Sequence, residues 1–217
     1  MRPLRHTYAA ALRTLLLLTL VSTISACAGT GALGVAREQF KSGSTDGALQ
    51  ILADASVSQR NQLLLHLDRG LVYQAAERFE ESVRAFDSAL DVINSLDYLS
   101  AKDQTAALLS SDWAIRYSGE SSERLWIHTF QMINYLMLNQ PQGAAVEARR
   151  AVALFEEHAD VLSPDIFTRY LMALSFHIAG QRDSAQVEFR KLGKDFSLQA
   201  PAPLKKNEGE LILFVAS

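Results

Sequence analysis

Five charged residues in the middle of the chain have the types and spacing that acid–base chemistry requires. Glu120 and Glu123 are three residues apart, and Glu147 closely precedes Arg149 and Arg150. Paired carboxylates can exchange protons with a substrate, and arginine binds carboxylate groups through two parallel hydrogen bonds. The same residue types also suit an ion-pair network, because Glu147 and Arg150 share one helical face. We expect the structural network, with anion recognition and then catalysis as the alternatives.

The other residues that could support chemistry are scattered. The five histidines show no metal-ligand spacing and no H-E-x-x-H pattern. The sequence also has no G-x-S-x-G nucleophile turn and no glycine-rich loop for phosphate. We therefore expect no metal, no cofactor and no catalytic residue, and hence a protein that is not an enzyme. The histidines are His6, His66, His128, His158 and His177.

Cys27 is the one cysteine in 217 residues, so the chain cannot form an internal disulfide bond. It follows a basic segment and the apolar run from Leu15 to Val21, which is too short to span a membrane comfortably. The residues from Ile24 to Cys27 resemble a bacterial lipobox, in which the thiol is acylated and the leader is removed. We expect residues 1–26 to be a signal peptide and Cys27 to be a lipid anchor. An ordinary signal peptide, with no lipid on Cys27, is the alternative.

The residues after Cys27 and the charge balance bear on location. Residues 27–34 combine the anchor with small uncharged residues, so we expect a flexible tether. By similarity to lipoprotein sorting in Gram-negative bacteria, Ala28 in place of aspartate indicates the outer membrane, facing the periplasm. Removing residues 1–26, which hold three arginines and no acidic residue, changes the net charge from −3 to −6. This balance argues against nucleic acid as a partner.

The rest of the sequence has the periodicity of helices. In residues 79–93, apolar residues recur at spacings of four, three, four and three, the pattern of an amphipathic helix. Small and aromatic residues recur at the spacing of tetratricopeptide (TPR) repeats, whose helical hairpins pack aromatic side chains against small ones. We expect an all-α, TPR-like array of about three to four helix pairs over residues 35–196, made irregular by uneven spacing. The matching positions are Gly70, Tyr73, Ser82, Phe86 and Ala89; Met132, Tyr135, Ala144, Ala148 and Ala151; and Ala173, Phe176, Ala185, Phe189 and Leu192.

Local signals predict where several helices begin. Pro141 is expected at the first position of one helix, because proline fits there without losing a hydrogen bond. Ser163, which precedes a proline, is expected to cap another helix. Ser100 and Asp103 resemble a capping box that would begin an additional helix reaching Tyr117.

Three further segments are predicted to be irregular. A partial first unit is expected to turn at Asp46–Ala48, and a longer turn is expected over residues 156–163. Residues 197–217 are predicted to be a proline-containing linker followed by an apolar tail, Glu210–Ala216, which is a short strand or an extended arm. A lone strand leaves backbone hydrogen-bonding groups unpaired, so we expect the tail to dock on the bundle or on a partner.

Residues 125–138 are apolar on almost every side of the expected helix. In the repeat register, Trp126 and Met137 face the inner, concave surface of the array. A helix that is apolar all round is normally enclosed, so one expectation is that neighbouring helices cover these residues. The alternative is an apolar groove that binds an extended peptide or a lipid chain. The inner-surface residues are Leu64, Leu67, Leu71, Trp126, Ile133, Leu136, Met137, Phe167, Tyr170, Leu174 and Ile178.

The sequence around this segment resembles a poorly characterised family of bacterial TPR-containing lipoproteins. The matching residues are a Tyr-x-Gly-Glu-x-x-Glu stretch at 117–123, Asn-Tyr-Leu at 134–136 and Glu-Ala-Arg-Arg at 147–150. The resemblance implies a TPR-like fold in an outer-membrane lipoprotein, and it implies no activity.

We therefore expect an adaptor or assembly factor for a cell-envelope complex, with an envelope protein or peptide as its partner. A periplasmic enzyme or ligand-binding protein acting on cell-wall or lipid material is the alternative. The candidate partner-binding residues are Trp126, Tyr135, Met137, Arg149, Arg150, Glu120, Glu123 and Tyr170.

Overall fold

The structure is a computed structural model of the 217-residue chain, and it describes residues 28–103, 119–162, 165–196 and 201. Over these residues it is all-α, as predicted, with nine α-helices, one 3-10 helix and no strand. Most helices pack in sequence order as antiparallel pairs. The pairs are α2 (Ala28–Lys41) with α3 (Thr45–Asp54), α4 (Gln62–Ala75) with α5 (Phe79–Asp103), α6 (Ser121–Met137) with α7 (Pro141–Glu157), and α9 (Ile166–Ile178) with α10 (Arg182–Phe196); the 3-10 helix η2 (Gln59–Asn61) precedes α4, and α8 (Ala159–Leu162) follows α7.

The four pairs share one turn geometry. Each turn has three residues, and its middle residue, Gly43, Glu77, Asn139 or Gly180, has a positive φ between 55° and 86°. In each, the amide of the third turn residue donates to the carbonyl five residues earlier, at 2.7 to 2.9 Å, and the middle amide donates to the carbonyl three residues earlier. This is the Schellman pattern, which satisfies the last carbonyls of a helix. The hairpins therefore repeat as backbone units even where the sequence match between them is weak.

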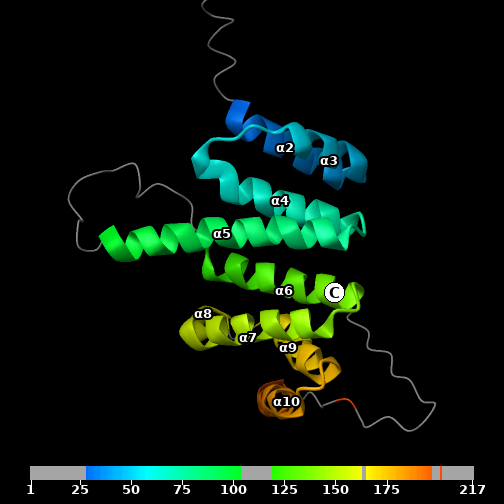
Figure 1. Cartoon of the computed structure of the whole chain (residues 1–217), viewed down its shortest axis with the longest axis vertical. Coiled ribbons are helices and arrows are strands. Elements are labelled where there is room, and N and C mark those ends of the chain that lie inside the picture. The colour runs from blue at the N-terminus through cyan, green and yellow to red at the C-terminus, as the bar shows by residue number, and fades with distance from the viewer. Residues whose placement is uncertain (1–27, 104–118, 163–164, 197–200, 202–217) are drawn as a thin grey trace, which may run out of the picture.

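The hairpins follow one another along the long axis of the molecule (Figure 1), from α2 and α3 at one end to α10 at the other. Helix α3 packs on α4, α5 packs on α6, and α7 packs on α9. The buried apolar residues form three clusters: one in α2 to α4, one in α4 to α6 and one in α6 to α10. Each hairpin thus stabilises its neighbours in the stack, as in other repetitive helical folds.

Close approach of helices within a hairpin depends on small residues. A β-carbon on Gly70 of α4 would come within 2.6 Å of the Phe86 ring of α5, and one on Gly143 of α7 would come equally close to the Tyr135 ring of α6. Ser82, Ala144 and the other small residues of the predicted pattern are buried; the full set is Ser82, Ala89, Ala144, Ala148, Ala151, Ala173 and Ala185. Aromatic rings therefore fill the space that small side chains leave, which is the packing that the residue spacing predicted.

The tether predicted at residues 27–34 is wrong from Ala28 onward. Helix α2 begins at Ala28, and its residues Leu33 and Ala36 are buried in the apolar cluster that α2 shares with α3 and α4. The small residues that suggested a flexible spacer are also compatible with a helix, and burial of Leu33 stabilises it. The folded part of the chain therefore begins earlier than the predicted residue 35. Cys27 and the predicted signal peptide lie outside the described residues.

Several predicted helix ends are also corrected. Ser100 and Asp103 do not begin a new helix, because α5 runs without a break from Phe79 to Asp103. The residue that caps α9 is Asp165 and not the predicted Ser163. Oδ1 of Asp165 accepts a 2.9 Å hydrogen bond from the Thr168 amide. Either residue type can cap a helix, so the signal was off by two positions. Pro141 begins α7 as predicted.

The turn of the first hairpin also differs from the prediction. It lies at residues 42–44, while Asp46–Ala48 form the first turn of α3, with Ala48 fully buried. The long turn predicted at residues 156–163 is occupied by the end of α7 and by α8. The rest of the additional helix, residues 104–118, and the apolar tail lie outside the described residues. Among the helices that the structure describes, none is long and apolar enough to cross a membrane.

Candidate functional site

The open side of α6 carries two large apolar residues. Trp126 is 55% exposed and Met137 is 61% exposed. They are eleven residues apart, which is close to three helical turns, so they lie on the same side of α6. Contacts with the flanking helices leave this side uncovered. Helix α4 meets α6 through a 2.8 Å hydrogen bond from Gln74 to Asn134, and α9 meets it through a 2.8 Å contact between the Thr129 and Thr168 hydroxyls.

The first helices of the neighbouring hairpins expose apolar side chains too. Leu71 of α4 is 36% exposed, and Phe167 and Ile178 of α9 are also exposed. Phe167 and Ile178 are eleven residues apart and share one side of α9, as Trp126 and Met137 do on α6. We call this set the apolar face; it comprises Leu71, Trp126, Met137, Phe167 and Ile178.

Neighbouring helices cover only part of the inner surface that the sequence predicted. Leu174 is buried, as full coverage would require. Tyr170 is half-buried and packs edge-on against the Phe189 ring at a centroid distance of 5.7 Å. The remaining members of the predicted set, Leu64, Leu67, Ile133 and Leu136, are half-buried. The expectation of complete coverage is therefore wrong for Trp126 and Met137.

Tyr135 does not belong to the apolar face. It lies on the opposite side of α6 from Trp126, nine residues away, and its ring packs against Gly143 of α7. Burial raises the pKa of the Tyr135 hydroxyl, and the nearby carboxylates of Asp87 and Glu147 raise it further. The structure therefore separates Tyr135 from the other apolar candidates.

The structure gives the five charged candidates separate local partners. The Glu120 amide donates to Glu123 Oε2 at 2.9 Å, so these two residues cap the beginning of α6. Arg149 donates to Gln181 Oε1 at 2.9 Å, whereas Arg150 donates to Glu147 Oε1 at 2.7 Å. The predicted pair of Glu147 and Arg150 is confirmed. Arg149 thus contacts the turn between α9 and α10, whereas Arg150 pairs within α7, so the two arginines do not form one anion-binding group.

Glu147 has a second partner that the sequence did not indicate. Its Oε2 lies 2.7 Å from His128 Nδ1, and both side chains are almost completely buried between α6 and α7. A buried carboxylate is costly unless it is paired and hydrogen-bonded. His128 and Arg150 together supply both contacts. No short-range pattern could reveal the pair, because the two residues are nineteen positions apart on different helices.

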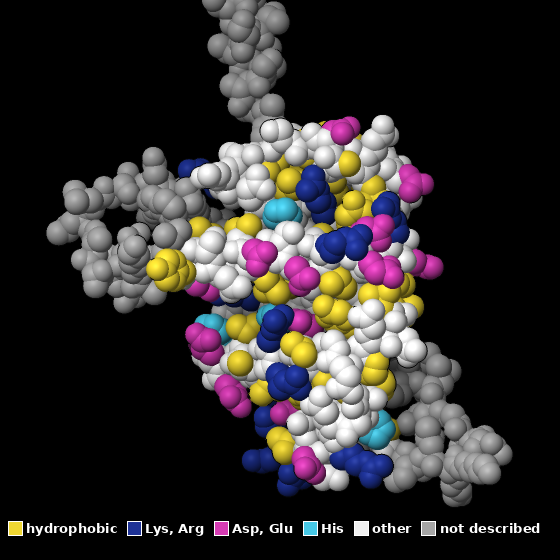
Figure 2. Space-filling view, viewed as in Figure 1, with side chains coloured by type: hydrophobic (Ala, Val, Ile, Leu, Met, Phe, Trp, Pro, Cys, Tyr) yellow, Lys and Arg dark blue, Asp and Glu magenta, His cyan; other side chains and the backbone are white. Residues whose placement is uncertain are grey.

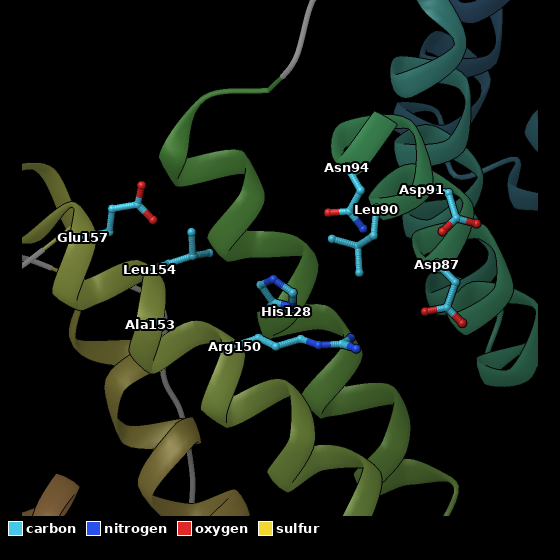
Figure 3. A pocket seen from close by; sticks show the side chains of 9 residues that line it. All are labelled: Asp87, Leu90, Asp91, Asn94, His128, Arg150, Ala153, Leu154 and Glu157. Carbon is cyan, nitrogen blue, oxygen red and sulfur yellow. The ribbon is translucent and has the colours of Figure 1, made fainter. Parts of the chain in front are cut away.

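A cleft of about 450 Å³ opens beside this pair. Figure 3 shows that its walls come from α5 on one side and α7 on the other, with His128 of α6 between them. The lining residues are Asp87, Leu90, Asp91, Asn94, His128, Arg150, Ala153, Leu154 and Glu157. Burial raises the pKa of the Asp87 carboxyl, and repulsion from Glu147 raises it further, against the opposing effect of Arg150.

The cleft has one feature of an acid–base site. An imidazole whose Nδ1 is bonded to a carboxylate is held in one orientation, and its Nε2 can then accept or donate a proton. The cleft also has the features of a structural ion pair, since Glu147 is buried and joins two helices. In the described part of the chain, no three His, Asp or Glu side chains gather where they could hold a metal ion.

A buried network of amides and hydroxyls fixes α6 against the preceding hairpin. Asn134 is fully buried; its Nδ2 donates to Ser82 Oγ at 2.8 Å, and its Oδ1 accepts from Gln74. Ser82 in turn donates to the Gly70 carbonyl at 2.7 Å.

No protein-family model, curated protein or solved structure matches the chain. Assignment of a function therefore depends on these contacts and on the sequence.

Proposed function

We propose that the chain is a lipid-anchored, periplasm-facing adaptor with a TPR-like array of helical hairpins, which binds an apolar segment of an envelope protein. The observation that carries this proposal is the apolar face. Exposed large apolar side chains occur on the first helix of all four hairpins, and those of the consecutive helices α4, α6 and α9 include the apolar face. Amphipathic or extended peptides dock on such surfaces through spaced apolar anchors.

The repeated turn supports the TPR-like description, because four hairpins with one turn geometry stack on their neighbours. The lipobox-like residues from Ile24 to Cys27 support the anchor. On the face in view in Figure 2, acidic and basic side chains are interspersed with hydrophobic ones. A nucleic-acid surface would need a concentration of basic side chains, so a protein partner is the better fit.

The test is cross-linked affinity purification from membranes, comparing the full chain with the double variant Trp126→Glu and Met137→Glu. Val161→Glu is the matched control, because Val161 of α8 is also 61% exposed but lies outside the apolar face. We expect one envelope protein to co-purify with the wild type and the control and to be lost with the double variant. Equal recovery with all three chains, or recovery of the bait alone from wild type, would refute the adaptor.

The anchor is tested separately. Cys27→Ser is expected to move the protein from the membrane fraction to the soluble fraction, because each acyl methylene contributes roughly 0.8 kcal/mol of membrane affinity. The matched control is Ser25→Ala, which changes a neighbouring residue and keeps the thiol. Membrane retention of Cys27→Ser would contradict the lipid anchor and leave the apolar face as an independent question.

A second candidate function is supported by the His128–Glu147 pair beside the cleft. A periplasmic enzyme would use His128 as a general base that Glu147 orients. Activity on cell-wall material that His128→Gln abolishes without loss of helical content would favour this function. Absence of any difference between wild type and His128→Gln would leave the pair as a structural contact.

A further inference from the structure

The cleft beside the His128–Glu147 pair lies on the other side of α6 from Trp126 and Met137. His128 is two residues from Trp126 and nine from Met137, so its side chain leaves the helix in nearly the opposite direction to both. The cleft volume of about 450 Å³ falls within the range of about 300 to 1,000 Å³ that is typical of small-molecule sites. What the cleft binds is therefore a separate question from the adaptor.

Each wall of the cleft is a single helical face. On α5 and on α7 alike, the lining residues are spaced three, one and three positions apart, which places them on adjacent turns of one side. Both faces combine apolar side chains with carboxylates, so a ligand between the walls meets carbon and negative charge together. The residues of α5 are Asp87, Leu90, Asp91 and Asn94, and those of α7 are Arg150, Ala153, Leu154 and Glu157.

The charge of the lining is negative. Asp87, Asp91 and Glu157 contribute carboxylates. Arg150, which extends from α7 toward α5 in Figure 3, donates to the buried Glu147 at 2.7 Å, so its positive charge already has a partner. Burial raises the pKa of the Asp87 carboxyl, and repulsion from Glu147 and Asp91 raises it further. A cation in the cleft would relieve this repulsion.

His128 presents a hydrogen-bond acceptor between the two walls (Figure 3). Only 8% of its side chain is exposed, and its Nδ1 lies 2.7 Å from Glu147 Oε2. In a neutral imidazole whose proton is on Nδ1, the lone pair of Nε2 accepts a hydrogen bond. Among the residues that the structure describes, none bonds to this Nε2. A ligand N–H group would supply the missing donor.

The arrangement of the acceptors favours an organic cation over a metal ion. Over the described ranges, no three His, Asp or Glu side chains are close enough together to hold a metal. A primary ammonium group has three N–H donors, and its alkyl chain can lie along apolar side chains. Leu90 and Leu154 line the cleft and are half-buried, so part of their carbon surface is accessible to such a chain.

We propose that the cleft binds an alkylammonium group, whose charge is balanced by Asp87 and Asp91 and whose N–H groups donate to His128 Nε2. The alkyl chain packs between Leu90 and Leu154. The proposal concerns binding alone, so it depends neither on the apolar face nor on His128 acting as a general base. A free alkylamine and a lysine side chain both carry this group, and the experiment distinguishes the two sources.

Isothermal titration calorimetry of the full chain with pentylammonium tests the proposal. At about pH 8, ordinary imidazoles are neutral and alkylammonium ions are charged. The double variant Asp87→Asn and Asp91→Asn removes two charges with little change in size. Asp54→Asn with Asp183→Asn is the matched control, because it removes the same charge from two exposed positions that do not line the cleft. Circular dichroism checks that both variants keep their helical content.

We expect pentylammonium to bind the wild type and the control variant equally, and the Asp87 and Asp91 variant about tenfold more weakly. Methylammonium should bind the wild type about tenfold more weakly than pentylammonium, because it lacks the chain that contacts the walls. Absence of pentylammonium binding to the wild type would overturn the proposal. Equal weakening in both double variants, or equal binding of uncharged 1-pentanol, would overturn it too, since neither outcome needs a charge-selective cleft.

Nα-acetyl-lysine methylamide distinguishes the two sources of the ammonium group. A dissociation constant similar to that of pentylammonium would show that the cleft admits a lysine side chain of a peptide. A dissociation constant more than about tenfold higher would assign the cleft to a free alkylamine, because the peptide backbone would then be excluded by the walls.

Discussion

The buried side of α6 carries polar residues, whereas its open side carries Trp126 and Met137. His128, Gln131 and Asn134 are almost completely enclosed, while the two largest apolar side chains of the open side are more than half exposed. Each enclosed residue is hydrogen-bonded to another helix: His128 to Glu147 of α7, and the two amides to α5. Buried polar contacts fix which helices pack together, because a wrong neighbour would leave them unsatisfied. The buried side of α6 therefore combines these polar contacts with the buried apolar residues Leu125, Ile127 and Met132, while Trp126 and Met137 on the open side lie outside the core.

The largest effect is expected from the buried ion pair. His128→Ala removes one of the two partners of the buried Glu147 carboxylate and leaves a cavity, so it should lower the free energy of unfolding by about 3 kcal/mol. Trp126→Ala on the open side of the same helix is the control and should cost less than about 0.5 kcal/mol. Urea unfolding followed by circular dichroism measures both. Similar losses in the free energy of unfolding for the two variants would show that the buried and open sides of α6 contribute equally to stability.

The amide network should give the next largest effect. Asn134→Leu keeps the branched shape and the number of side-chain heavy atoms and removes both hydrogen bonds, which leaves Ser82 and Gln74 without those contacts in the interior. We expect a loss of about 2 kcal/mol in the free energy of unfolding. Met137→Leu is the control, since it retains an apolar side chain at an exposed position. An Asn134→Leu protein as stable as wild type would mean that the network is dispensable.

Gly70 tests how tightly the buried surfaces fit. In Gly70→Ala the new β-carbon would lie 2.6 Å from the Phe86 ring, so the ring or the helix must shift at a cost of about 1 to 2 kcal/mol. Gly34→Ala is the matched control, because Gly34 also lies within a helix and a β-carbon there meets no atom within 4 Å. The control should be neutral or slightly stabilising. Thermal unfolding measures the midpoint temperature of both variants. Equal midpoints would show that the hairpin is loosely packed at Gly70.

The smallest effect concerns the pH dependence contributed by Asp87. Burial, followed by repulsion from Glu147, raises the pKa of this carboxyl in the folded protein. The folded state therefore keeps the proton to higher pH than the unfolded state does, so the contribution of Asp87 to stability declines as the pH rises from the unfolded to the folded pKa. Asp87→Asn removes that decline. The Tm of the variant relative to wild type should rise by about 1 °C between roughly pH 4 and pH 7. A constant difference would contradict the raised pKa.

Much of the fold could be predicted because it depends on local rules. The apolar period of residues 79–93, the opening proline at Pro141 and the small residues facing aromatic rings all follow from helix geometry and packing. The pairing of Glu147 with Arg150 is likewise local, since the two residues lie on adjacent turns of one helix. These signals need no knowledge of which hairpin lies beside which.

The rest depends on contacts between helices that are distant in sequence. Residues 125–138 predicted an enclosed helix, yet which side of α6 is covered depends on where α4 and α9 pack. The His128–Glu147 pair is set by the register of α6 against α7, and the capping of α9 by Asp165 is one choice between two suitable residues. The helix from Ala28 was missed because its small residues carry no strong local preference and the burial of Leu33 decides the outcome.

The early beginning of α2 has a mechanical consequence. If Cys27 carries acyl chains, the attachment point is the residue immediately before the helix, with no intervening linker. The first hairpin would then lie directly at the lipid surface, and motion of the stack would be limited to tilting about that point. In the proposed adaptor, the height of each later hairpin above the membrane would follow from its position in the stack, and a partner would have to present its segment at the height of α6 and α9.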